Sequence, residues 1–346
     1  MSIEVRKAAI GTLEHEYSGK VICYVTSERR GMETKIAGDA VFLLRRHLDA
    51  IGDVPKLALF LVSRGGDTLV PWQIVNLIRE YCHTFEVLAP YTAHSAATLI
   101  SLGADTIYMT KMATLTPIDP TVANPFNPSD PNNPTAKVGI SVEDVTAFIQ
   151  LAKDQGIKDA AQLTQVFLAL TNHVHPLALG NVQRSHSQIR HLARELLKLH
   201  MPAEEETSRI EDIVKTVTER LYTHAHTIGR REAAQIGLKV STAPPGLDRA
   251  MWSLFEAYVK DLEMFDPFNP DAMLGGADSK PLALERAYIE SARHTDVFVS
   301  EGMLRKLPPG PPIAGVSMPG RIQVPPGVQM AQVAVELSFE GWRSLA

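Results

Sequence analysis

Short β-branched runs alternate with longer segments of helical spacing over residues 20–110, and this alternation constrains the fold more than any other feature. It predicts strands at Val21–Thr26, Leu57–Val62, Phe85–Leu88 and Thr106–Met109. Helices are predicted between them at Ala37–Ile51, Pro71–Tyr81 and Ser95–Leu102. Such alternation builds βαβ units, whose strands lie parallel and whose ligands bind at the carboxyl edge of the sheet. We therefore expect an α/β fold with a mostly parallel sheet.

The remainder of the chain changes character twice. Residues 117–134 contain six prolines among Asn, Asp and Ser, which predicts an extended loop. Residues 141–237 have helical spacing and are expected to form a helical layer on the sheet or a subdomain. We divide the chain into a domain of residues 1–245 and a C-terminal extension of residues 246–346. In the extension we predict helices at Met251–Met264 and Pro281–Arg293, a loop at Asp266–Ser279, a Pro-rich arm at Pro308–Pro326, and strands at Val297–Ser300 and Gln332–Phe339.

Charge and cysteine content exclude several classes of protein. The 34 Lys and Arg residues against 39 Asp and Glu give a net charge of −5, without the basic excess that binding to nucleic acid needs. Cys23 and Cys82, the only cysteines, lie beside apolar residues, so neither a disulfide framework nor a thiolate metal cluster is expected. The first 20 residues lack the pattern of a secretion signal, and no stretch of about 18 apolar residues predicts a membrane span. We expect a cytoplasmic protein.

Two strand-to-helix turns carry candidate chemistry. Gly65 and Gly66 follow the apolar run LALFLV after Ser63 and Arg64, where their N–H groups could face an oxyanion; taken alone, such a pair is more often an ordinary tight turn. Ser95 stands where the run FEVLAP gives way to the helix SAATLISLGA. The free N–H groups at a helix start favour developing negative charge, so Ser95 is a candidate nucleophile or a helix cap.

Taken in order, these motifs resemble a known superfamily. The segments Ser63-Arg64-Gly65-Gly66 and Ala93-His94-Ser95-Ala96-Ala97 are similar to the S-P-G-G and nucleophile motifs of the Clp protease and signal peptide peptidase A superfamily of serine peptidases. The segment TIGRREAAQIGL at 227–238 resembles the helix that follows the peptidase core there. The segments ATLTPIDPTV, SVEDV, HPLALGNVQRSH and VFVSEG resemble serine dehydrogenase proteinases in particular.

The resemblance runs from about Leu13 to Glu301 and implies a Clp/crotonase-like ββα superhelix fold, followed by an irregular C-terminal extension. It implies that Ser95 is the nucleophile and that Gly65, Gly66 and Ala96 form the oxyanion hole. Arg64, which replaces the proline of S-P-G-G, and His94 would border the substrate groove.

The proton acceptor is less clearly marked in the sequence. The Clp histidine would fall near Leu115–Pro120, which contains no histidine. Signal peptide peptidases use a lysine forty to fifty residues after the serine, and Lys137, 42 residues after Ser95, matches that spacing. Lys137 is thus the candidate general base, with a solvated loop lysine as the alternative; Lys111 is a second candidate. Asp119 is the candidate third member of the site.

These observations predict a cytoplasmic serine peptidase that cleaves peptides or proteins through an acyl-enzyme with a lysine base. The alternatives are an inactive scaffold of the same fold, and a crotonase-like acyl-CoA enzyme, which would not need Ser95. Paired histidines at 173, 175, 224 and 226 lack completing carboxylate or cysteine ligands, so we expect no metal, and no motif predicts a cofactor. The resemblance also implies a homo-oligomer built from trimeric units.

Overall fold

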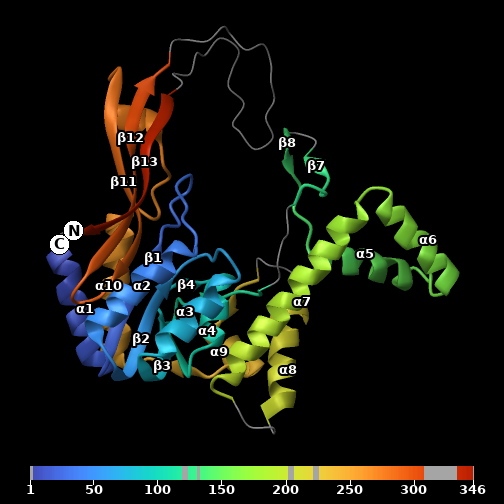
Figure 1. The fold of residues 1–346 in the computed structure, drawn as a ribbon, viewed down its shortest axis with the longest axis horizontal. Helices are drawn as coiled ribbons and strands as arrows, with labels where there is room; N and C mark the ends of the chain where they lie inside the picture. The colour runs from blue at the N-terminus through green and yellow to red at the C-terminus, as the bar shows by residue number, and fades with distance from the viewer. Residues whose placement is uncertain are drawn as a thin grey trace.

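An eight-stranded mixed sheet between two layers of helices forms the body of the molecule (Figure 1). The computed structural model describes residues 3–118, 124–130, 133–201, 206–220, 226–307 and 333–345. The strand order is β10-β5-β3-β2-β1-β11-β12-β13, in which the first five strands are parallel and the last three are antiparallel. The predicted α/β class is confirmed.

Four of the five parallel strands lie close to the predicted runs, and the fifth, β10, was not predicted. They are β1 (Lys20–Thr26), β2 (Val54–Val62), β3 (Cys82–Ala89), β5 (Thr106–Met109) and β10 (Val240–Thr242). The antiparallel strands are β11 (Ser279–Glu290), β12 (Thr295–Lys306) and β13 (Val333–Leu345). Two small sheets pair β4 (Thr92–Ala93), β6 (Thr114–Leu115) and β9 (Ile228–Gly229), and β7 (Ser129–Asp130) with β8 (Asn133–Lys137).

Helices cover both faces of the sheet, which explains the continuous apolar runs of its strands. In β1, Ile22 and Tyr24 enter one core while Val21, Cys23 and Val25 enter the other. The first core contains α2 (Asp39–Ile51), α3 (Val70–Arg79), α4 (Ala96–Leu102), α7 (Pro176–Lys198), α8 (Thr207–Lys215), the π-helix η2 (Thr216–Arg220) and α9 (Arg230–Ile236). The second contains α1 (Ile3–Tyr17) and α10 (Pro245–Asp261).

The C-terminal extension is more regular than expected. The predicted helix at 281–293 is wrong, because residues 281–290 belong to β11 and residues 291–293 lie in the turn before β12. Leu282 and Leu284 are buried while Ala283 and Glu285 are exposed, which is the period of a strand. The predicted loop at 266–279 contains the short helix α11 (Pro270–Leu274). The predicted Pro-rich arm lies outside the described residues.

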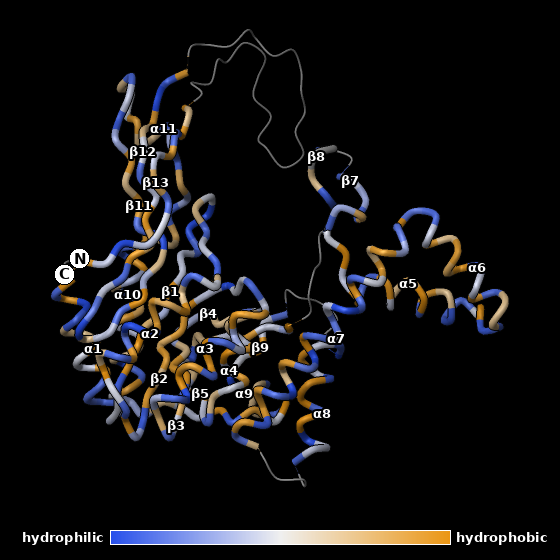
Figure 2. The backbone as a smooth tube through the Cα atoms, in the orientation of Figure 1, coloured by the Kyte–Doolittle hydropathy of each residue, from blue (hydrophilic) through white to orange (hydrophobic). Residues whose placement is uncertain are grey.

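Two elements project from the body. Helices α5 (Val142–Asp154) and α6 (Ala160–Thr171) form a hairpin that extends away from α7 (Figure 1). Strands β7 and β8, which precede α5 in the chain, form a second hairpin. Neither α5 nor α6 buries a side chain, although both carry apolar residues (Figure 2). In the described part of the chain, no helix has the length and hydropathy needed to cross a membrane.

Candidate active site

Ser95 occupies the turn between β4 and α4 with a strained backbone. Its φ of 52° and ψ of −113° lie where a residue with a side chain is rarely found. Such strain costs about 1–3 kcal/mol and concentrates at functional sites. The partly exposed Ser95 hydroxyl forms no hydrogen bond within the described part of the chain, so it is free to react.

Two threonines hold this turn, and neither was singled out from the sequence. The Ser95 N–H donates to Thr116 Oγ1 at 2.8 Å, and the Thr116 N–H donates to Thr98 Oγ1 at 3.1 Å. The Thr98 hydroxyl donates to the Ala93 carbonyl at 2.8 Å. Their signal in the sequence is faint: each is a buried hydroxyl within a mostly apolar stretch.

The segment TIGRREAAQIGL at 227–238 supports the Ser95 turn through strand pairing. Thr114 pairs with Gly229 and Leu115 with Ile228, so β9 of the TIGRREAAQIGL segment lies beside β6. β6 pairs in turn with β4, the strand that leads into Ser95. Segments more than a hundred residues apart therefore converge on the nucleophile's turn.

Gly65 allows the end of β2 to approach the nucleophile. Its φ is 106°, and a Cβ added there would lie 2.6 Å from the Ser95 Cβ. The Gly65 N–H donates to Ser63 Oγ at 3.0 Å, and Ser63 Oγ also accepts from Thr26 at 2.8 Å. The Gly65 N–H is therefore engaged within its own turn, and this position leaves no room for a side chain. The place of Gly65 in the oxyanion hole stays a prediction.

Gly66 and Ala96 have backbone N–H groups that remain available to bind an oxyanion. A Cβ at Gly66 would lie 2.1 Å from the Ile36 carbonyl oxygen, so this position also requires glycine. Neither the Gly66 nor the Ala96 N–H has an acceptor among the described residues. Two free donors on the turns beside a free hydroxyl are what a tetrahedral oxyanion needs.

Arg64 and His94 stand next to these two turns, and their role in a substrate groove stays a prediction. Arg64 Nε donates to Glu28 Oε2 at 2.9 Å, and the second oxygen of this buried carboxylate accepts from the Thr92 hydroxyl. The His94 Nε2 lies 2.8 Å from Thr114 Oγ1. Glu28 was not predicted, because it lies 36 residues before Arg64 and only the sheet order brings the two together.

The candidate bases do not contact Ser95 in this single chain. Lys137 is exposed on β8, which Figure 1 shows apart from α4, and its ammonium donates to Ser129 Oγ at 3.2 Å. Lys111 is exposed in the turn after β5. Asp119 lies outside the described residues. The roles of Lys137 and Asp119 therefore stay predictions.

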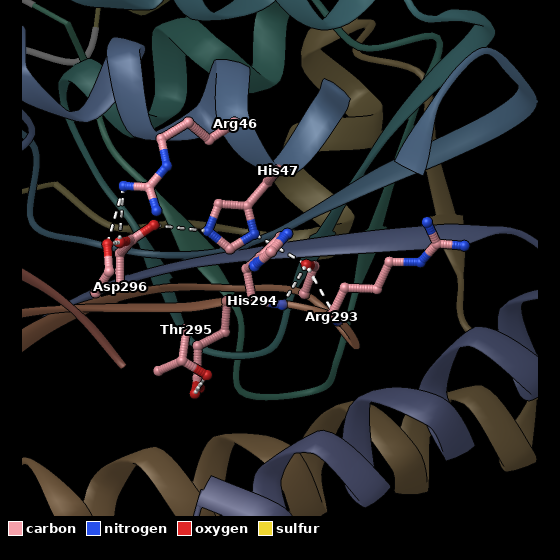
Figure 3. Close-up of polar contacts among 9 residues, drawn as sticks. Arg46, His47, Arg293, His294, Thr295 and Asp296 are labelled. Atoms are coloured by element: carbon pink, nitrogen blue, oxygen red, sulfur yellow. Dashed lines mark hydrogen bonds and ion pairs between the residues drawn. The ribbon is translucent and has the colours of Figure 1, made fainter. Parts of the chain in front are cut away.

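A Ser–His–Asp cluster lies elsewhere in the molecule (Figure 3). The His47 Nδ1 lies 2.9 Å from Ser291 Oγ, and its Nε2 lies 3.1 Å from Asp296 Oδ2. Because the carboxylate accepts, Nε2 carries the proton and Nδ1 accepts from the serine. Burial lowers the pKa of His47, and Asp296 opposes this effect. All three side chains are fully buried, so no substrate reaches them and the cluster serves to join α2 to the β11–β12 turn.

The histidine pairs do not form a metal site in the described structure. His175 caps α7 by accepting from the Leu177 N–H, and His226 Nε2 lies 2.8 Å from Glu232 Oε1. Within the described residues no three His, Cys, Asp or Glu side chains gather in a way that could hold an ion. His224 lies outside the described residues.

Comparison with known proteins relates this geometry to a family. Residues 38–176 match the family described as ClpP-like SDH-type serine proteinase. The resemblance to serine dehydrogenase proteinases is thereby confirmed. The matched range contains all the predicted site residues, from Arg64 to Lys137.

Individual relatives are distant. Two uncharacterized proteins of Methanocaldococcus jannaschii are 25% identical over 214 residues and 24% identical over 206 residues. These matches cover 61% and 60% of this chain and 62% and 58% of the relatives, so the chain spans less than two thirds of their length.

Two solved structures of the 1510-N membrane-bound stomatin-specific protease also align with the chain. One is a serine-to-alanine mutant, at 13% identity and a TM-score of 0.37, covering 66% of this chain and 81% of that one. The other is a lysine-to-alanine mutant in complex with a substrate peptide, at 14% identity and a TM-score of 0.36, covering 61% and 74%.

Proposed function

We propose that the chain is a cytoplasmic serine peptidase in which Ser95 attacks the scissile carbonyl and forms an acyl-enzyme. The observation that carries the proposal is the strained Ser95 turn, whose free hydroxyl stands with the free N–H groups of Gly66 and Ala96. In this mechanism the two N–H groups bind the oxyanion of the tetrahedral intermediate. The match to serine proteinases supports this chemistry, and the two unpaired thiols support a reducing compartment.

A serine hydroxyl needs a proton acceptor, and we propose Lys137 for this role. In the single chain its ammonium is occupied by Ser129, so the β7–β8 hairpin must move or the site must depend on assembly. The exposed apolar residues of α5 and α6, among them Phe148, Leu151 and Phe167, support a homo-oligomer. In an assembled site, burial would favour the neutral form of the lysine, which can accept the proton.

The second candidate function is an inactive scaffold of the same fold. It is favoured by one observation: among the described residues, no titratable side chain forms a hydrogen bond with the Ser95 hydroxyl. The two candidates differ in whether Ser95 is activated, which a reactive probe measures directly.

The test is labelling of the purified protein with a fluorophosphonate probe, read by intact mass at several pH values up to about 9. We expect one adduct on the wild type and none on Ser95→Ala or Lys137→Ala. Lys111→Ala tests the second candidate base, an exposed lysine of the same region, and should label like the wild type if Lys137 is the base. An intact oligomer that never labels would establish the scaffold; labelling of Lys137→Ala would remove that lysine as the base.

A further inference from the structure

Arg64 is fixed beside the nucleophile by the backbone on either side of it. The preceding Ser63 donates its N–H to the Thr92 carbonyl and accepts from the His94 N–H, both at 2.9 Å. The following Gly65 faces Ser95, as a Cβ there would meet the Ser95 Cβ at 2.6 Å. The end of β2 and the strand leading into Ser95 thus run side by side, with Arg64 between two anchored residues.

The guanidinium group is held on one edge and open on the other. Its Nε donates to Glu28 Oε2 at 2.9 Å, and the Arg64 side chain remains 66% exposed while that of Glu28 is 4% exposed. Neither terminal nitrogen of Arg64 forms a hydrogen bond within the described part of the chain. Glu28 therefore sets the orientation of the guanidinium and leaves its two terminal NH₂ groups to a ligand.

Charge neutralisation of Glu28 does not account for this arrangement by itself. An ion pair with so exposed a partner contributes only about 0–1 kcal/mol, which is less than the cost of removing the Glu28 carboxylate from water. A hydrogen bond between two ionised groups contributes about 1.5–3 kcal/mol, and the planar fork of arginine matches a carboxylate bidentately. The open edge of Arg64 is thus suited to an anionic group on a bound peptide.

We propose that Arg64 binds a carboxylate of the substrate next to the scissile bond, which makes the site selective for acidic peptides. This inference rests on the proposed peptidase function. The carboxylate has two possible sources, an Asp or Glu side chain near the cleaved bond or the C-terminal carboxylate of a short peptide. Both present the same planar anion to the guanidinium.

The test compares fluorogenic peptides that differ only in this charge. One series places Glu or Gln at each of the four positions on either side of the cleaved bond, and a second pairs a C-terminal acid with its amide. For the wild type we expect kcat/KM to favour the acid about tenfold in one series, which identifies the source of the carboxylate. In Arg64→Gln this acid-to-amide ratio should fall to about one.

Two further variants separate recognition from folding. The double variant Glu28→Gln/Arg64→Gln removes the buried charge together with its partner and should show the same loss of selectivity. Arg45→Gln, which breaks the exposed Arg45–Asp49 pair on α2, should keep the wild-type ratio. A wild type that labels at Ser95 yet cleaves acid and amide peptides equally overturns the inference and leaves the proposed function standing. A wild type that neither labels nor cleaves overturns both.

Discussion

At the scale of single residues, the candidate site depends on Gly65, because the Ser95 side chain leaves no room for another side chain there. Gly65→Ala would suffer both a positive φ of 106° and a Cβ only 2.6 Å from the Ser95 Cβ. We expect the variant to lose roughly 3 kcal/mol of unfolding free energy and at least about tenfold in fluorophosphonate labelling rate, because the clash displaces the nucleophile. Urea unfolding and timed labelling measure the two losses.

Gly52 provides the matched control. Its φ is 75°, but an added Cβ would meet nothing within 4 Å, so Gly52→Ala suffers only the backbone strain. We expect about 1 kcal/mol of destabilisation and unchanged labelling. If the two variants behave alike, the contact between Gly65 and Ser95 does not set the geometry of the site.

Some residues of the candidate site could be predicted from the sequence and others could not. Gly65, Gly66 and Ser95 stand out because each lies in a turn between a strand and a helix, and a local pattern identifies such positions. Glu28 and Thr116 act only through contacts with Arg64 and Ser95, residues 36 and 21 positions away. Contacts of that kind are created by strand order, and no local pattern carries them.

At the scale of elements, the buried His47 joins α2 to the β11–β12 turn and makes the stability of that junction depend on pH. Burial lowers the pKa of His47 in the folded protein, so below about pH 6.5 the unfolded chain binds a proton that the folded chain does not. Stability from this group is therefore complete above about pH 6.5. It is lost as the pH falls, by at most about 1.4 kcal/mol per pH unit.

His47→Gln should reduce this dependence. We expect the difference in unfolding free energy between pH 7.5 and 5.5 to be smaller in the variant than in the wild type, as measured by urea denaturation. His200, whose pKa is also lowered by burial, provides the matched variant His200→Gln, which should act in the same direction. An unchanged pH dependence in His47→Gln would mean that the protonated imidazole is accommodated beside Asp296.

Element prediction failed where residues that favour helix form a strand. The stretch Leu282–Ala287 contains Leu, Ala, Glu and Arg, which favour helix, yet Leu282 and Leu284 alternate into a small core with Leu274 and Leu304. Pairing with β12 on one side and with β1 further along overrides the local preference. The strands β1, β2 and β3 were predictable because their apolar runs are buried on both faces, whereas the short β10, which has no such run, was not predicted.

At the scale of the whole molecule, one sheet crosses the boundary that composition placed after residue 245. Cys23 of β1 pairs with Glu290 of β11, and α1 packs against α10 in the same core. The sequence indicated the parallel half because each βαβ unit is local. It did not indicate that the chain's two ends share a core, since that contact joins segments about 250 residues apart.

A buried ion pair at this junction tests how strongly the two ends depend on each other. Arg6 of α1 donates from Nε and Nη2 to Glu290 at 2.8 and 3.1 Å, and also contacts Asp261 of α10. Arg6→Met would leave the buried Glu290 carboxylate without its cation, so we expect a loss of about 3–5 kcal/mol in urea unfolding. Lys20→Met, which breaks the exposed pair between Lys20 and Glu14, should cost less than about 1 kcal/mol. Similar small losses in both variants would mean that apolar packing alone joins the N-terminal helix to the C-terminal extension.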